Sequence, residues 1–140
     1  MKRILITSMA LCCLFFARGT MGDTPNTQLL DTYWRLVELN GKELKPAANE
    51  KEEIHIILKK EGNLLEGFAG CNSIGGSYEV KDNHLTFANV IGTMVSCPET
   101  EIENLFLEIL KSTETYSVNG SMLTLGNKEM AAAAKFMKKK

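Results

Sequence analysis

The sequence lacks an excess of charge of either sign. Its 140 residues carry 16 lysines and arginines against 17 aspartates and glutamates, which gives a formal net charge of −1. Proteins that bind the phosphate backbone of nucleic acids present clusters of basic side chains. We therefore expect no nucleic-acid partner. The length leaves room for one domain of ordinary size and for no second one.

Motifs of common catalytic and phosphate-binding sites are also absent. The chain has no Gly-x-Ser-x-Gly elbow, no phosphate-binding loop and no His-Glu-x-x-His, and only His55 and His84 are available as histidine bases or ligands. We predict a non-enzymatic protein without cofactor or metal. Two alternatives stay open: a hydrolase or thiol-dependent enzyme using Cys71 and a histidine such as His84, and a zinc site from both histidines, Cys71 and Cys97, which lacks the close Cys-x2-Cys spacing.

The one long hydrophobic run lies at the amino terminus. Residues 4–16 follow Lys2 and Arg3 and are almost wholly apolar. The run is too short for a membrane-spanning helix, which needs about 20 residues. A basic start, a short apolar run and then small residues are typical of a secretory signal peptide. We predict a signal peptide over residues 1–22 with cleavage after Gly22, and cleavage after Gly19 is the alternative.

Cys12 and Cys13 in this run raise the possibility of a lipoprotein with an acylated cysteine. Against it, Leu11 stands before Cys12 where a small residue is preferred. We expect an exported protein, periplasmic or associated with the outer membrane, without a transmembrane helix in the mature chain.

Removal of the signal changes the charge and the cysteine count. Residues 1–22 hold three of the 16 basic residues and no acid, so 13 basic and 17 acidic residues remain and the net charge becomes −4. Two of the four cysteines remain, Cys71 and Cys97. In an oxidising compartment such a pair usually forms a disulfide, which we predict here as a structural bond.

Hydrophobic patterning predicts a sheet with one helix. Residues 23–32 are polar and are expected to form a flexible leader. Strand alternation begins near Tyr33, with Trp34 and Leu36 on one face and Leu39 on the other. Residues 42–53 are predicted to be a surface loop. Strands or short extended segments are predicted at residues 33–39, 54–60, 64–70, 77–80, 84–88, 91–96, 115–118, 122–125 and 130–136, the last one despite the helix propensity of its four alanines.

The helix is predicted over residues 101–112. Its apolar residues follow the spacing of one helical face: Ile102, Leu105, Phe106, Ile109 and Leu110. Pro98 suits the first turn, and Glu99, Glu101 and Glu103 suit the positive end of the helix dipole. Glycines around Cys71 are interpreted as bends of a curved sheet. If that sheet leaves space beneath the helix, its apolar lining could hold an acyl chain or an exposed segment of another protein.

These motifs, in this order, resemble the META domain, or HslJ-like, family over residues 33–137. The most specific part is a Gly-Cys-Asn block, then Gly-x-Tyr, then Thr-Met-x-x-Cys-Pro before an acidic helix. The residues that carry the resemblance are Trp34, Gly67, Gly70, Cys71, Asn72, Gly76, Tyr78, Thr93, Met94, Cys97 and Pro98.

The resemblance implies a small α+β domain, with a strongly curved antiparallel sheet or cracked β-barrel and one helix packed on it. Proteins of this family are mostly exported or envelope-associated, some as lipoproteins, and are linked with heat shock and novobiocin resistance in bacteria. The family implies no catalytic residue. We therefore expect a monomeric, exported, non-enzymatic envelope protein. Its role would be stress response or envelope maintenance, through a protein or lipidic partner bound at the sheet or its edge.

Overall fold

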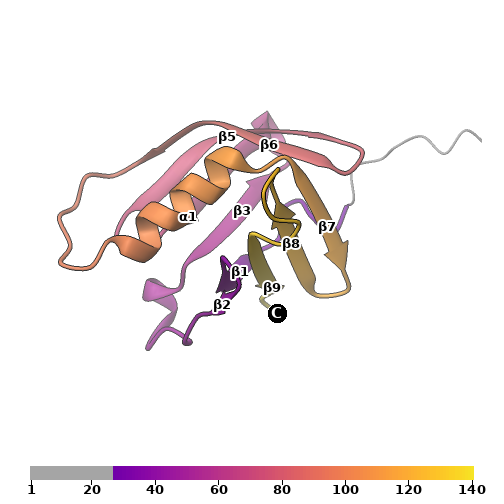
Figure 1. Cartoon of the computed structure of the whole chain (residues 1–140). Helices are drawn as coiled ribbons and strands as arrows, with labels where there is room; N and C mark the ends of the chain where they lie inside the picture. Colours follow the sequence, from indigo (N-terminus) through magenta and orange to yellow (C-terminus); the bar gives the residue numbers. More distant parts are fainter. Residues whose placement is uncertain (1–26) are drawn as a thin grey trace, which may run out of the picture.

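A computed structural model describes residues 27–140 (Figure 1). The predicted signal peptide and residues 23–26 of the predicted leader lie outside the described residues. The elements are β1 (Trp34–Leu39), β2 (Lys42–Glu43), the 3-10 turns η1 (Glu50–Glu52) and η2 (Glu61–Asn63), β3 (His55–Lys59), β4 (Leu64–Phe68), β5 (Ser73–Lys81), β6 (His84–Gly92), α1 (Glu101–Ser112), β7 (Thr115–Asn119), β8 (Met122–Gly126) and β9 (Ala134–Lys138).

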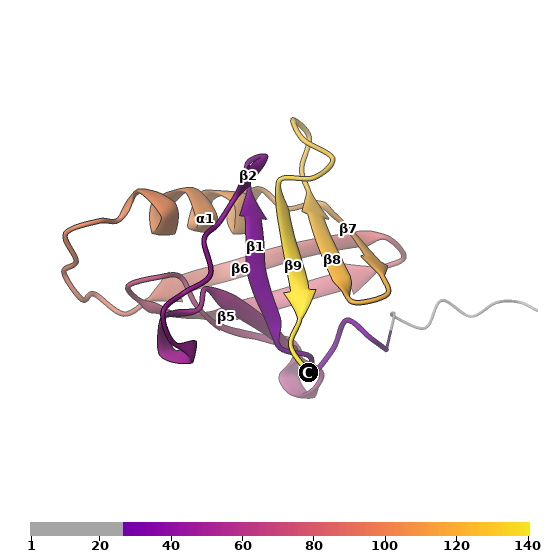
Figure 2. The same ribbon diagram turned by 90° about the horizontal axis from the view of Figure 1, so that it is seen from below.

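Eight of these strands form a closed antiparallel barrel. The order is β1-β3-β4-β5-β6-β7-β8-β9, and β9 pairs back with β1, while the two-residue β2 adds to the end of β1. Figure 2 shows β1, β9, β8 and β7 side by side. The joint between β6 and β7 is narrow, with His84 opposite Thr115 as its one strand pair. The predicted strongly curved sheet is thus a barrel, and the described residues contain one α-helix, as expected.

The helix connects β6 to β7 and lies along β6 (Figures 1 and 2). Phe106 on its buried side meets Phe136 of β9 with 6.1 Å between ring centroids, and both side chains are fully buried. The side chains of Phe106 and Phe136 therefore fill space under the helix, where we considered a bound acyl chain or protein segment. Other fully buried residues around them are Trp34, Leu29, Ile56, Leu58, Leu65, Leu85, Leu110, Leu123 and Leu125.

Strand β1 departs from strict alternation. Trp34 and Leu36 face the core as predicted, but Leu39 is buried as well. The register against β9 shifts between Leu36 and Glu38. This β-bulge inserts one extra residue into β1 and brings Leu39 back to the core side. The prediction that Leu39 lies on the other face of the strand from Trp34 was therefore wrong.

Several boundaries also differ from the predictions. Strands β5 and β6 extend to Ser73 and Gly92, because β4 and β6 pair with the glycine-containing part of β5. A bulge in β6 places Asn89 and Val90 opposite Gly76 and shifts the register by one residue. Residues 93–96 form a loop. Strand β9 begins at Ala134, since Asn127 holds the preceding turn by accepting hydrogen bonds from the backbone N–H groups of residues 129 and 130. The predicted loop 42–53 contains β2 and η1.

Residues 27–32 pack on the barrel instead of forming a leader. Leu29 is fully buried, and its carbonyl oxygen accepts a hydrogen bond of 3.0 Å from Trp34 Nε1. The N–H of Asp31 donates to the Leu58 carbonyl oxygen at 2.8 Å. This segment covers the part of β3 that β1 does not pair with. The folded domain therefore begins before Tyr33, and the polar residues on either side of the Leu29-Leu30 pair concealed this in the sequence.

We expect Leu29→Ala to destabilise the protein by about 2–5 kcal/mol, because it empties a fully buried site. The matched substitution Leu64→Ala removes a side chain that is 47% exposed and should change stability by about 0.5 kcal/mol or less. Urea unfolding of both variants measures the difference. Equal stabilities would contradict the inclusion of residues 27–32 in the cooperative unit.

Candidate functional site

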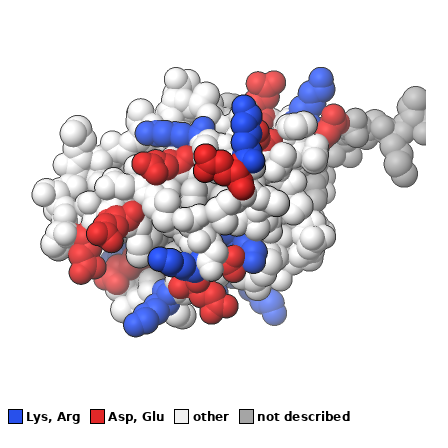
Figure 3. Space-filling model, in the orientation of Figure 1, with Lys and Arg blue, Asp and Glu red and all other residues white. Residues whose placement is uncertain are grey.

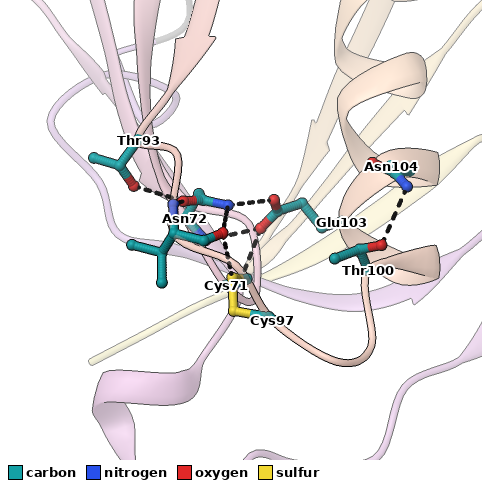
Figure 4. Close-up of a disulfide and its surroundings, with 8 residues drawn as sticks. Cys71, Asn72, Thr93, Cys97, Thr100, Glu103 and Asn104 are labelled. Carbon is teal, nitrogen blue, oxygen red and sulfur yellow. Dashed lines mark hydrogen bonds between the residues drawn. A yellow bond between two sulfur atoms is a disulfide. The ribbon is translucent and has the colours of Figure 1, made fainter.

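A disulfide joins the turn after β4 to the segment before α1. Cys71 and Cys97 form this bond, with their Cα atoms 6.2 Å apart (Figure 4). The predicted pairing is therefore present. Closing a loop across 26 positions stabilises a fold by about 3–4 kcal/mol in the chain-entropy view. The bond leaves no thiol at Cys71 for the nucleophile or zinc-ligand alternatives.

The two histidines lie in different parts of the barrel. His55 stacks on Tyr33 with 4.3 Å between ring centroids, and His84 stands opposite Thr115 at the joint of β6 and β7. Within residues 27–140, no group of three or more histidine, cysteine, aspartate or glutamate side chains is arranged to hold a metal ion.

Asn72 links three parts of the chain. Its Oδ1 accepts hydrogen bonds from Thr93 Oγ1 at 2.8 Å and from the backbone N–H of Val95 at 2.7 Å, while its Nδ2 donates to Glu103 Oε1 at 2.7 Å (Figure 4). Asn72 is itself buried. A single amide therefore fixes the loop after β6 on one side and α1 on the other.

Glu103 is a buried carboxylate. Its Oε2 accepts hydrogen bonds from the backbone N–H groups of Cys71 at 2.9 Å and Asn72 at 2.8 Å. Burial by itself raises the pKa of Glu103, but the hydrogen bonds from Asn72 and Cys71 outweigh it and hold the pKa below its usual 4.5. As the third residue of α1, the ionised group also lies at the positive end of the helix dipole.

The buried face of α1 agrees with the prediction at Phe106, Ile109 and Leu110, and Leu105 is half-buried against the core, but the face differs at its start. Glu103, Phe106, Ile109 and Leu110 are buried, whereas Ile102 is 47% exposed. The sequence assigned Glu103 only to the dipole and missed its buried role. The sequence did contain a signal for this role, because Glu103 lies three residues before Phe106 and seven before Leu110 and so shares their face of the helix. Pro98 also lies outside the first turn, because the helix begins at Glu101 after the N-cap Thr100.

Exposed apolar side chains lie on residues 91–98, which comprise the last two residues of β6 and the loop after it and which we call the anchored loop. Met94 is fully exposed, and Ile91 and Val95 are 73% and 59% exposed. The backbone of Val95 is nevertheless held by Asn72 through its N–H, and Cys97 is covalently fixed. Residues 88–98 contain no charged residue. Apolar side chains grouped on an exposed surface are typical of interaction sites.

The other residues of the predicted motif build the barrel wall. A Cβ at Gly67 would collide with the carbonyl oxygen of His55 on the neighbouring strand, and Gly70 has a φ of +115° at the turn before the disulfide. The Tyr78 hydroxyl donates to the Lys59 carbonyl oxygen at 3.0 Å. The motif thus divides into positions that shape the barrel, namely Trp34, Gly67, Gly70, Gly76 and Tyr78, and positions at the anchored loop or its supports, namely Cys71, Asn72, Thr93, Met94, Cys97 and Pro98.

Together, the fold and the site define a small antiparallel β-barrel domain with a disulfide-anchored surface loop. The family model of the META domain matches residues 27–140. The chain belongs to the META domain family, as its motifs indicated. No helix within residues 27–140 has the length and apolar character needed to span a membrane.

Solved structures share this fold. An NMR structure of a protein from Burkholderia xenovorans is 26% identical, with a TM-score of 0.62 over 79% of this chain and 83% of that one. A second NMR structure is 20% identical, with a TM-score of 0.61 over 79% and 91%. A crystal structure of a DUF4847 family protein from Bacteroides vulgatus is 15% identical, with a TM-score of 0.59 over 78% and 93%. A comparison with curated proteins finds no match.

We expect Glu103→Gln to lower stability by about 1–3 kcal/mol at neutral pH, because an amide cannot accept hydrogen bonds at both oxygen positions and leaves buried N–H groups unpaired. The folded pKa is depressed, so the stabilisation is complete above the unfolded pKa of 4.5 and is lost as pH falls through the folded pKa. The loss of stability below pH 4.5 should therefore be smaller in the variant. Urea unfolding across pH measures this.

Glu101→Gln is the matched control, since Glu101 is an exposed residue of the same helical turn. The Glu101→Gln variant should have the same stability as the unaltered protein and the same loss of stability at acid pH. Identical acid profiles for the Glu103→Gln variant and the unaltered protein would show that Glu103 is not ionised in the network.

Proposed function

We propose that this protein is an exported, non-enzymatic member of the META domain family that binds another protein through the anchored loop. The observation that carries the proposal is the combination of a fixed loop backbone with apolar side chains in solvent. Met94 is fully exposed, while Asn72 and the disulfide hold the loop on both sides of it. We further propose a role in stress response or envelope maintenance for the monomeric protein.

The energetics favour this use of the loop. Burying an apolar side chain of this size against a partner gains about 1.5–3 kcal/mol. A binding loop that is already ordered avoids much of the entropy cost of association. The restraints at Asn72 and Cys97 therefore allow more of the free energy gained by apolar burial to appear as binding affinity. A flexible loop of the same composition would bind more weakly.

The chemistry of Cys71 supports a non-enzymatic role. A thiol-dependent mechanism needs a cysteine thiolate and a nearby base, and the disulfide occupies the sulfur. Closure of the barrel supports the monomer, since a closed sheet has few unpaired edges through which copies associate. A disulfide of this kind also suits an oxidising compartment, in agreement with the signal-like residues 1–22.

Export is tested by fractionation of cells combined with the intact mass of the protein. We expect the periplasmic or outer-membrane-associated fraction to contain a chain that starts at Asp23 and lacks the two hydrogens of a reduced Cys71–Cys97 pair. An uncleaved chain in the cytoplasm would overturn the proposed location. A mass that includes acyl groups would identify a lipoprotein and overturn cleavage after Gly22.

The anchored loop is tested by photo-crosslinking in cells. A photoreactive residue placed at position 94 is expected to yield one discrete protein adduct, because Met94 projects into solvent where a partner would bind. The same residue at position 64, a partly exposed position on β4, is the control and should yield no such adduct. Absence of the adduct at position 94, or adducts with lipid alone, would contradict a protein-binding loop.

A further inference from the structure

A groove runs from β1 to the start of α1. One hollow of about 650 Å³ lies between β1, the segment after β2 and the start of the helix. A second hollow of about 720 Å³ continues from the helix start toward Gly70 and Pro98. Ile54, Glu99 and Ile102 line both hollows, so the two form one depression, which we call the Ile102 groove. Each hollow has the size of typical binding pockets, about 300–1,000 Å³.

The floor of the Ile102 groove is apolar. Val37, Leu44 and Ile54 are only half-buried, and Ile102 is 47% exposed although it stands among core positions of the helix. Rotation of α1 toward the Glu103 network explains this exposure, because the network places Glu103 instead of Ile102 on the inner side. The fold thus leaves apolar surface in a concave site.

The rim of the groove is acidic. Its exposed carboxylates are Glu43, Glu52, Glu99 and Glu101, and within residues 27–140 none of these four forms an ion pair. Glu53 also lines the groove but is bound by Lys139 at 3.1 Å. Arg35 and Lys45 are the basic residues of the lining. Figure 3 shows acidic side chains around the start of α1, beside the uncharged projecting loop.

We propose that the Ile102 groove binds an extended protein segment that carries both apolar and basic side chains. Apolar side chains of the segment would cover Ile102 and its neighbours, and lysines or arginines would meet the unpaired carboxylates. Charge complementarity of this kind selects partners and orients them. The excess of carboxylates disfavours an anionic membrane surface. This inference rests on the proposed function, because it gives the chemistry of the protein partner and adds a second contact surface.

Synthetic peptides test the inference with the intact protein. We use a labelled ten-residue peptide that alternates valine with lysine, and a matched peptide that alternates valine with glutamate. Fluorescence anisotropy should detect binding of the lysine peptide only. Ile102→Asp should weaken that binding at least tenfold, because it places a charge on the apolar floor. Leu64→Asp is the control, since Leu64 is equally exposed at 47%, and should bind as the unaltered protein does.

Charge variants separate recognition from simple hydrophobic adhesion. Glu99→Lys together with Glu101→Lys should weaken the lysine peptide at least tenfold and allow the glutamate peptide to bind. Glu79→Lys, on an exposed position of β5 outside the groove, should do neither. Thermal unfolding confirms that each variant is folded. All substituted positions are exposed, so the native core remains intact in these proteins.

Three results would overturn the inference: equal binding of both peptides, unchanged binding by the Ile102→Asp variant, or binding to phosphatidylglycerol vesicles without binding to the lysine peptide. A protein adduct at position 94 without peptide binding would refute the groove and leave the proposed function standing. Peptide binding in the groove without an adduct at position 94 would refute the anchored loop instead.

Discussion

The buried carboxylate of Glu103 determines how the helix sits on the barrel. An ionised group taken out of water is costly unless hydrogen bonds replace its hydration. Two backbone N–H groups and the Asn72 amide supply these bonds. Any rotation of α1 that withdrew Glu103 would leave the charge and its donors unpaired together. The network therefore fixes one rotation of the helix, which turns Phe106 inward and Ile102 outward.

Two different restraints hold the anchored loop. The disulfide fixes Cys97, and Asn72 fixes Thr93 and Val95 by hydrogen bonds to its Oδ1. Since Asn72 also binds Glu103, the position of the loop is coupled to the position of the helix. The loop can expose apolar side chains without collapsing onto the barrel because its backbone already has partners. Its exposed apolar surface is therefore a feature of the folded structure and not of local disorder.

The sequence predicted correctly those features that depend on neighbouring residues or on composition. The bounds of α1, the hairpin of β7 and β8, and the pairing of Cys71 with Cys97 follow from periodicity, turn residues and cysteine count. Contacts between distant segments decided the rest. Leu29 is buried because its segment covers the free edge of β3, and Leu39 is buried because β1 bulges against β9. Glu103 is buried because it binds Asn72, which lies 31 positions away in the sequence. No window of neighbouring residues contains that information.

The acidic residues before and within the first turn of α1 link stability with recognition. Glu103 forms hydrogen bonds inside the protein, whereas Glu99 and Glu101 remain at the surface beside Ile102. Their charges suit the helix dipole, so the fold tolerates them without ion-pair partners. The anchored loop leads directly into this turn, and one partner could therefore contact both surfaces. In such a complex the apolar side chains would supply affinity, and the carboxylates would set which segment binds and in which direction.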